Sequence, residues 1–264
     1  MKAQVRGFEM AYEDTGGDGI PLLLIHGFPL DRTLWTAQVQ GLADAARVIA
    51  PDLRGWGESG LPGGAVTMDT YADDLRGLLD ALGVKNAVVC GLSMGGYIAF
   101  AFYRQHAHRV RGLILADTKA GPDSPEGKQG RDDNIALARA QGAAAVGDKM
   151  LPKMFTPKTL AARADVANAA RAMMARQSVA GVVSALKAMR DRPDSTSTLA
   201  EITVPTLVIA GAEDQLIPVQ EAEAMRAAIR GARLVSIPGA AHLANLEQPD
   251  AFNAAVREFL KSLV

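Results

Sequence analysis

Ser93 has the surroundings that most directly indicate chemistry. It lies in Gly91-Leu92-Ser93-Met94-Gly95, a G-x-S-x-G pattern between the β-branched run VVC and a helix-like apolar run. This pattern is typical of a serine held on a sharp strand-to-helix turn, where glycines avoid crowding and the helix N-terminus favours a developing negative charge. The simpler interpretation is a plain glycine-rich turn, so the pattern depends on its context. A phosphate-binding loop fits less well, because GLSMGG lacks the P-loop lysine and is not G-x-G-x-x-G.

A serine hydroxyl is a weak nucleophile without a neighbouring base, and the chain has four histidines. His242 follows the last strand-like run, in SIPGAAHLANLEQP, and comes late in the chain, as a Ser…Asp…His order requires. His106 and His108 lie at the polar end of a helix-like stretch, where we expect them to be solvated. His26 precedes Gly27 at the end of an early strand and is expected to brace a loop. We therefore predict His242 as the general base.

The base needs an acid to orient its imidazole and to stabilise its cation. Asp214, in LVIAGAEDQLIP, follows a strand-like run, and Asp117, at the end of GLILAD, is its rival. Both turns open at the same end of a parallel sheet. Glu213 is adjacent to Asp214 but is expected to point elsewhere. The chain order and the GAEDQLIP pattern favour Asp214.

Backbone N–H groups are expected to bind the oxygen that becomes negative during attack. The run LLLIHGFPLD places His26, Gly27 and Phe28 directly after an early strand. The N–H groups of Phe28 and Met94 are therefore expected to point at one carbonyl oxygen and form an oxyanion hole.

Short apolar runs rich in Val, Ile and Leu recur along the chain: PLLLIHG, ARVIAPDL, NAVVCGLS, VRGLILADT, PTLVIAGAED and ARLVSIPGA. Continuous runs of this kind are typical of strands buried on both faces of a parallel sheet. Helix-like stretches lie between most of them, at residues 35–42, 70–82, 95–106, 219–229 and 249–263. This alternation predicts a doubly wound α/β fold, which binds ligands at the carboxyl ends of its strands. The more polar N-terminal run QVRGFEMAYEDTG is expected to pair antiparallel at one edge.

The alternation is interrupted from residue 122 to residue 198 by an Ala-, Met- and Arg-rich stretch without a clear strand. Proline and serine signals in GPDSPEG and RPDSTST mark its edges. We predict a helical lid of three or four helices at 122–198, inserted into a core domain of 1–121 and 199–264. Six apolar lid residues at roughly helical spacing are expected to pack against the core or to line a pocket: Met150, Met154, Phe155, Met173, Met174 and Met189.

The composition limits the choice of partners and compartment. The 264 residues carry a net charge of -1, which gives no electrostatic reason to expect nucleic acid or an anionic membrane as a partner. The start MKAQVRGFEM has no apolar signal-peptide core, and IPLLLI is too short to span a bilayer. The single cysteine, Cys90, lies in a buried-looking strand and rules out an internal disulfide. We therefore expect a cytoplasmic protein with a small-molecule substrate, as a monomer or homodimer.

Five motifs occur in the order found in the α/β-hydrolase superfamily, which the chain resembles over nearly its whole length: HGFP, PDLRGWGES, GLSMGG, GAEDQLIP and GAAHLANLEQP. It is similar in particular to the branch that holds 3-oxoadipate enol-lactonases, small carboxylesterases and cofactor-free haloperoxidases. The resemblance implies a mostly parallel eight-stranded sheet flanked by helices, with a helical cap after the sixth strand. It also implies a Ser93–His242–Asp214 triad, without a metal or a cofactor. Haloalkane dehalogenases and epoxide hydrolases are excluded, because they carry aspartate at the nucleophile position.

These features predict a carboxylic ester hydrolase that cleaves a small ester or lactone through an acyl-enzyme on Ser93. Carbon–carbon bond hydrolysis or perhydrolysis at the same triad is the alternative, because the motifs do not separate these reactions. A non-enzymatic ligand sensor on the same fold is a third interpretation. The Met-rich lid predicts small or medium apolar acyl and alcohol groups. Four lid cations are expected to be solvated: Arg131, Arg139, Lys149 and Arg176.

Overall fold

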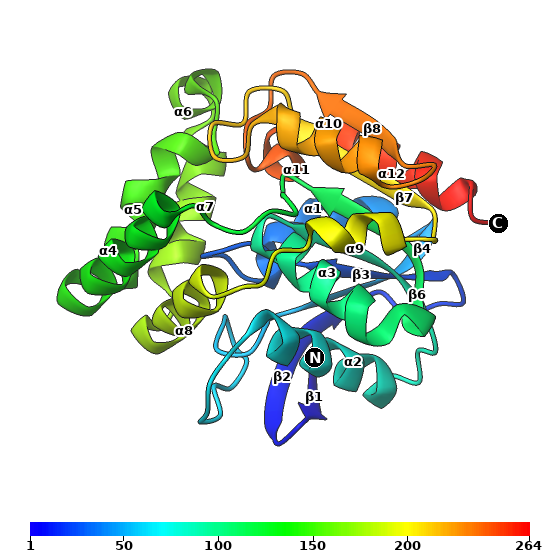
Figure 1. Cartoon of the computed structure of the whole chain (residues 1–264), viewed down its shortest axis with the longest axis horizontal. Coiled ribbons are helices and arrows are strands. Elements are labelled where there is room, and N and C mark those ends of the chain that lie inside the picture. The colour runs from blue at the N-terminus through cyan, green and yellow to red at the C-terminus, as the bar shows by residue number, and fades with distance from the viewer.

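The structure, a computed structural model, describes residues 1–264 and is built on one eight-stranded sheet (Figure 1). Its strands lie in the order β1-β2-β4-β3-β5-β6-β7-β8. Their bounds are β1 Lys2–Val5, β2 Phe8–Asp14, β3 Ile20–Ile25, β4 Ala46–Pro51, β5 Ala87–Leu92, β6 Val110–Ala116, β7 Thr206–Gly211 and β8 Arg233–Ile237. Strands β3 to β8 pair in parallel, whereas β1 and β2 are antiparallel to their neighbours. The predicted fold class and the antiparallel N-terminal edge are confirmed.

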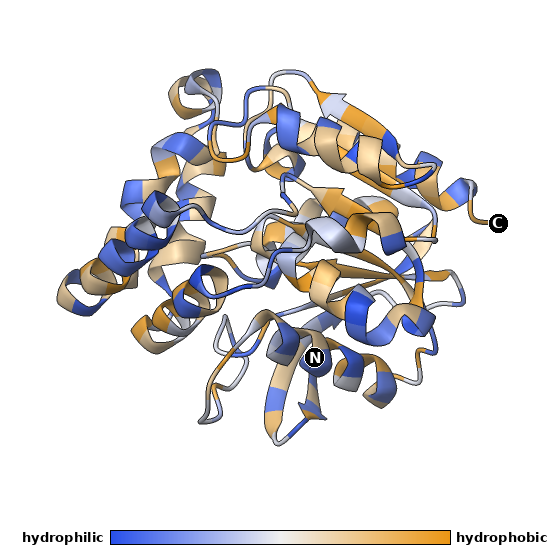
Figure 2. Ribbon diagram, viewed as in Figure 1, coloured by the Kyte–Doolittle hydropathy of each residue, from blue (hydrophilic) through white to orange (hydrophobic).

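The central strands are apolar because helices cover both of their faces. Every residue of β5 and β7 is buried, and Figure 2 shows the sheet as mainly hydrophobic beneath helices of mixed hydropathy. One face packs against α2 Met68–Ala81, α3 Met94–His106, α9 Thr196–Glu201 and α10 Val219–Ala228. The other packs against α1 Thr36–Leu42, α11 Ala244–Glu247 and α12 Pro249–Lys261. Two short 3₁₀ helices complete this part, η1 Arg32–Trp35 and η2 Ala107–Arg109.

Residues 122–198, which we call the lid, contain five complete helices between β6 and β7, to one side of the sheet (Figure 1). They are α4 Pro125–Gln141, α5 Ala143–Met154, α6 Pro157–Ala162, α7 Ala164–Ala175 and α8 Val179–Arg190. The expectation of three or four helices was wrong, because Gly142 at φ 90°, the Thr156–Pro157 start and the Ser178 cap interrupt an alanine-rich run. None of the helices is long and apolar enough to cross a membrane. The division into core and lid domains stays a prediction.

Polar contacts join the lid to the loop after β3 and to α11. Arg176 and Gln177 donate to the carboxylate of Asp31, over 2.6–2.9 Å. Thr156 donates through its backbone N–H and its hydroxyl to Glu247 Oε1, at 2.9 and 2.8 Å. These contacts fix the lid over the carboxyl ends of the parallel strands.

The parallel register gathers the strand ends at one edge of the sheet. Ile25 pairs with Gly91, Leu92 pairs with Ala116, and Gly211 pairs with Ile237. The loops that follow β3, β5, β6, β7 and β8 therefore open beside one another. Phe28, Ser93, Asp117, Asp214 and His242 each lie in one of these loops.

A buried ion pair connects the loop after β4 to α2. Arg54 donates to both carboxylate oxygens of Asp74, at 2.6 and 2.7 Å, and neither side chain is more than 8% exposed. Removal of one partner of such a pair leaves a buried charge without compensation.

We expect Asp74→Ala to lower the free energy of unfolding by about 3–5 kcal/mol, because Arg54 would keep its charge in a buried place. The control is Asp80→Ala on the same helix, where the carboxylate is 44% exposed and pairs with Arg109. An exposed pair contributes at most about 1 kcal/mol. Urea unfolding of both variants measures the difference, and equal losses would contradict this assignment.

Candidate active site

The backbone of Ser93 is held in a conformation that residues other than glycine rarely adopt. Its φ is 55° and its ψ is −114°, at the junction of β5 and α3. Its N–H donates to the Ala116 carbonyl at 2.9 Å. Its own carbonyl accepts from Gly96 N–H at 2.9 Å and from the Thr118 hydroxyl at 2.8 Å. These contacts fix both sides of the turn, so the hydroxyl is presented at the start of α3.

The turn needs glycine on both sides of Ser93. A Cβ atom at Gly91 would lie 2.2 Å from the Gly95 carbonyl oxygen, and one at Gly95 would lie 2.2 Å from the Ile25 carbonyl oxygen. Both distances are far below van der Waals contact, and the obstructing atoms are backbone. At Gly27 the added atom would be 3.0 Å from the Leu92 side chain. The G-x-S-x-G spacing therefore has a steric cause in this fold.

Ser93, His242 and Asp214 lie in one hydrogen-bonded chain. His242 Nε2 is 2.9 Å from Ser93 Oγ, and His242 Nδ1 is 2.8 Å from Asp214 Oδ2. The side chains of His242 and Asp214 are 3% and 1% exposed. Asp214 Oδ1 accepts from the N–H groups of Leu216 and Ile217, at 2.8 and 3.0 Å. Since the carboxylate accepts from Nδ1–H, Nε2 is free to accept the serine proton.

Asp117, the rival acid, forms no hydrogen bond with His242. Its Oδ1 accepts from Gly211 N–H at 2.6 Å, and its buried Oδ2 has no hydrogen-bond partner. Burial raises the pKa of Asp117 well above its usual range, and the nearby charge of Asp214 adds to this shift. Burial therefore favours the protonated form of this side chain. Glu213, the other neighbour, is exposed.

His26 is buried and bonded to backbone on both sides of its ring. Its Nε2 accepts from Leu53 N–H at 3.1 Å, so Nδ1 carries the proton and donates to the Gly27 carbonyl at 3.0 Å. Burial lowers the pKa of His26, which keeps the ring neutral. The Trp56 ring makes edge contacts with His26 and with Phe28. These contacts join the loop after β3 to the loop after β4.

The other two histidines and the single cysteine lie away from this hydrogen-bonded chain. The expectation for His106 was wrong, because it is half-buried with Nε2 3.1 Å from Asp73 Oδ1, whereas His108 is exposed as expected. Cys90 is buried in β5, and burial raises the pKa of its thiol. No group of three or more His, Cys, Asp or Glu residues is arranged to hold a metal ion.

The hydroxyl of Ser93 and the imidazole of His242 meet at a cavity of about 110 Å³ between the sheet edge and the lid. Its nine lining residues are Phe28, Ser93, Tyr97, Arg131, Met150, Met189, Leu216, Ile217 and His242. The Phe28 N–H has no hydrogen-bond partner in the protein. Met94 is the first residue of α3, where N–H groups lack an acceptor within the helix. Both N–H groups are therefore free to bind an added oxygen.

The cavity includes residues that the sequence did not single out. Tyr97 lies one turn into α3, and Leu216 and Ile217 follow Asp214. Their closeness in the sequence to Ser93 and Asp214 could have indicated that they line the site. Of the six apolar lid residues, Met150 and Met189 line the cavity. The other four are packed in the apolar core.

The expectation that the lid cations are solvated was wrong for Arg131, which lines the cavity. Arg176 is 46% exposed as expected, although it also binds the buried Asp31. Arg139 and Lys149 are exposed as expected.

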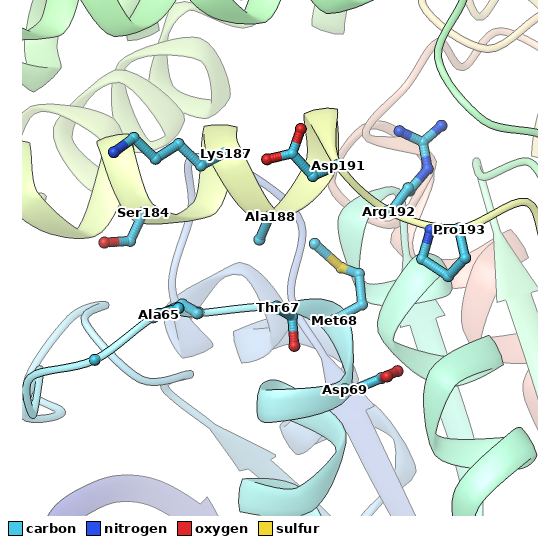
Figure 3. A pocket seen from close by; sticks show the side chains of 12 residues that line it. Ala65, Thr67, Met68, Asp69, Ser184, Lys187, Ala188, Asp191, Arg192 and Pro193 are labelled. Carbon is cyan, nitrogen blue, oxygen red and sulfur yellow. The ribbon is translucent and has the colours of Figure 1, made fainter.

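A wider pocket of about 410 Å³ lies between α8 and residues 64–69 (Figure 3). Its labelled side chains include Lys187, Asp191 and Asp69, and the guanidinium of Arg192 points away from it (Figure 3). None of the predicted site residues lines this pocket. We place the candidate active site in the smaller cavity, because Ser93 Oγ and His242 Nε2 line it and lie 2.9 Å apart.

The family described as alpha/beta hydrolase fold matches residues 20–249. An esterase from Thermogutta terrifontis, solved with malate bound, is 43% identical, with a TM-score of 0.96 over 100% of this chain and 99% of that chain. 3-Oxoadipate enol-lactonase 2 of Acinetobacter baylyi is 30% identical over 240 residues, which cover 91% of this chain and 88% of the lactonase. A non-heme haloperoxidase of Rhodococcus erythropolis is 30% identical over 273 residues, which cover 97% of both chains. The chain therefore belongs to the α/β-hydrolase family.

Proposed function

We propose that this protein hydrolyses a small carboxylic ester or lactone through an acyl-enzyme on Ser93. The observation that carries this proposal is the unbroken chain from Ser93 Oγ to His242 Nε2 at 2.9 Å, and from His242 Nδ1 to Asp214 Oδ2 at 2.8 Å. Similarity to an esterase and to an enol-lactonase supports the reaction class.

The geometry suggests the order of events. Ser93 Oγ attacks the ester carbonyl while His242 Nε2 accepts its proton, and Asp214 stabilises the imidazolium. His242 then protonates the departing alcohol oxygen, which leaves an acyl group on Ser93. Water, deprotonated by His242, attacks this acyl group and releases the acid and the free serine. In a lactone the alcohol and the acid are two ends of one product.

The N–H groups of Phe28 and Met94 are the donors for the oxyanion of each tetrahedral intermediate. The positive end of α3 adds to this stabilisation, because Ser93 is its N-cap residue. Such donors contribute most in a site that excludes water, and the lid residues Met150 and Met189 form an apolar part of the cavity wall here.

The volume of the cavity favours small substrates. Pockets for drug-sized ligands measure about 300–1,000 Å³, and this cavity measures about 110 Å³. We therefore infer a short acyl chain.

Perhydrolysis is the second candidate, because a haloperoxidase is among the relatives. It would use hydrogen peroxide in place of water against the same acyl-enzyme. Assay of ester cleavage with and without peroxide separates the two reactions.

We expect Ser93→Ala to reduce kcat to less than about a thousandth of the wild-type value, because no other hydroxyl is bonded to His242. The thermal unfolding midpoint should stay close to that of the wild type, since the hydroxyl contributes little packing. Ser236→Ala, at an exposed position of β8, is the control and should keep full activity. Residual turnover well above that limit in folded Ser93→Ala would refute the assignment.

The pH dependence of kcat/KM should report the protonation of His242. Only the neutral imidazole accepts the serine proton, so kcat/KM should fall on the acid side, approaching tenfold per pH unit. Stopped-flow hydrolysis of para-nitrophenyl acetate with chemistry rate-limiting gives the profile. A profile without any acid-side fall while the enzyme stays folded would contradict this role.

The two aspartates should respond very differently to amide substitution. Asp214→Asn should lower kcat by about 10⁴, because the amide does not stabilise the imidazolium or the required tautomer. Asp117→Asn should stay within about threefold of the wild type, because Asp117 forms no hydrogen bond with His242 and an amide oxygen there still accepts from Gly211 N–H. Both variants are compared on one ester. A crippled Asp117→Asn enzyme beside an active Asp214→Asn enzyme would reverse the assignment.

A further inference from the structure

The backbone on both sides of His242 is hydrogen-bonded to residues outside its own loop. Ala241 N–H donates to Glu247 Oε2 at 2.6 Å. Leu243 N–H donates to the Met154 carbonyl at 3.2 Å. Met154 is the last residue of α5 in the lid, and all of these residues are buried. The residue before His242 is therefore fixed by a glutamate, and the residue after it by the lid itself.

The carboxylate of Glu247 is bonded to the lid as well. Its Oε1 accepts from the N–H and the hydroxyl of Thr156, at 2.9 and 2.8 Å. Thr156 is the N-cap residue of α6 and lies two residues after the end of α5. Both contacts between the lid and this loop therefore start from residues 154–156, which we call the lid junction.

The sheet holds the same loop through its backbone. The Ala240 carbonyl accepts from Glu213 N–H at 2.9 Å. A Cβ atom at Gly211 would lie 2.0 Å from the Ala241 carbonyl oxygen, so the loop packs directly on the end of β7. The loop that carries the acid begins at this strand end. The place of the imidazole is therefore set by a loop that packs on the strand of the acid and is bonded to the lid.

We propose that Glu247 is a positioning residue for His242, and that the lid junction completes the catalytic site by acting through it. Glu247 does not line the cavity and acts through the backbone of Ala241. Helix α5 carries Met150 in the cavity wall, so one lid helix both contacts the substrate and ends on the loop of the base. This inference rests on the proposed function, and it gives the lid a part in turnover.

Glu247→Gln tests the proposal, because an amide keeps the size of the side chain but has one acceptor oxygen and a nitrogen that only donates. In either orientation this nitrogen faces the donor of Ala241 or those of Thr156. We expect kcat for para-nitrophenyl acetate to fall about 10- to 100-fold, since a displacement of about 1 Å can cost about 100-fold. KM should stay within about threefold, because the cavity wall is unchanged.

Proton NMR supplies a readout that a merely structural role would not change. His242 Nδ1 donates to Asp214, and a hydrogen bond to a carboxylate moves this proton downfield. The signal is identified by its absence in His242→Ala. We expect it to shift or broaden in Glu247→Gln, measured well below the unfolding midpoint of the variant.

Thr156→Ala tests the lid side while Glu247 stays in place. It should lower kcat less than Glu247→Gln does, because the backbone N–H remains, and Thr156→Ser should restore the wild-type value. Ser178→Ala is the matched control, because Ser178 is also the N-cap residue of a lid helix and accepts from an N–H three residues later. It makes no hydrogen bond to Glu247, so its kcat should equal that of the wild type.

Wild-type kcat or an unchanged NMR signal in folded Glu247→Gln would overturn the proposal. Equal losses in Thr156→Ala and Ser178→Ala would also overturn it, since they indicate a general loosening of the lid. If Glu247→Gln does not fold, Thr156→Ala decides, and wild-type kcat in that variant would overturn the proposal. Ester cleavage that survives Ser93→Ala, beside an NMR signal that Glu247→Gln alters, would instead refute the proposed function and leave the positioning role intact.

Discussion

The arrangement of the site depends on the backbone of Ser93, which the sheet and α3 hold at φ 55° and ψ −114°. This conformation turns the chain from strand to helix within one residue and leaves the serine hydroxyl at the positive end of α3. The turn packs against the carbonyl oxygens of Gly95 and Ile25, so neither Gly91 nor Gly95 has room for a side chain. In the proposed mechanism His242 and Asp214 act on this one atom, Ser93 Oγ, through the hydrogen bonds that join the three side chains.

Glu247 connects the lid to the loop that carries His242. Glu247 on α11 accepts from the lid residue Thr156 with Oε1, and from Ala241 N–H with Oε2 at 2.6 Å. Ala241 directly precedes His242. The carboxylate is buried, so loss of its partners would leave a charge without compensation. Glu247 therefore connects the lid to the residue before His242, so we expect the packing of the lid to affect the position of His242.

The sequence predicted the parts of the site that depend on local patterns and on chain order. Ser93 was identified by glycine spacing between a strand and a helix, and His242 and Asp214 by their loops at strand ends. The place of Arg131 could not be predicted, because it depends on how the lid packs against residues far away in the chain. The raised pKa of Asp117 likewise depends on burial and on the charge of Asp214, which no local pattern encodes. The lid helices were undercounted because single capping residues divide a uniformly alanine-rich run.

Covalent labelling tests the central claim most directly, since it identifies the nucleophile without knowledge of the substrate. The wild-type enzyme is treated with a small organophosphonate, and peptide mass spectrometry locates the adduct while residual esterase activity is followed. The account predicts one adduct, on Ser93, whose occupancy rises in proportion to the loss of activity. An enzyme that stays active with Ser93 fully modified, or that loses activity through an adduct on another residue, would contradict it.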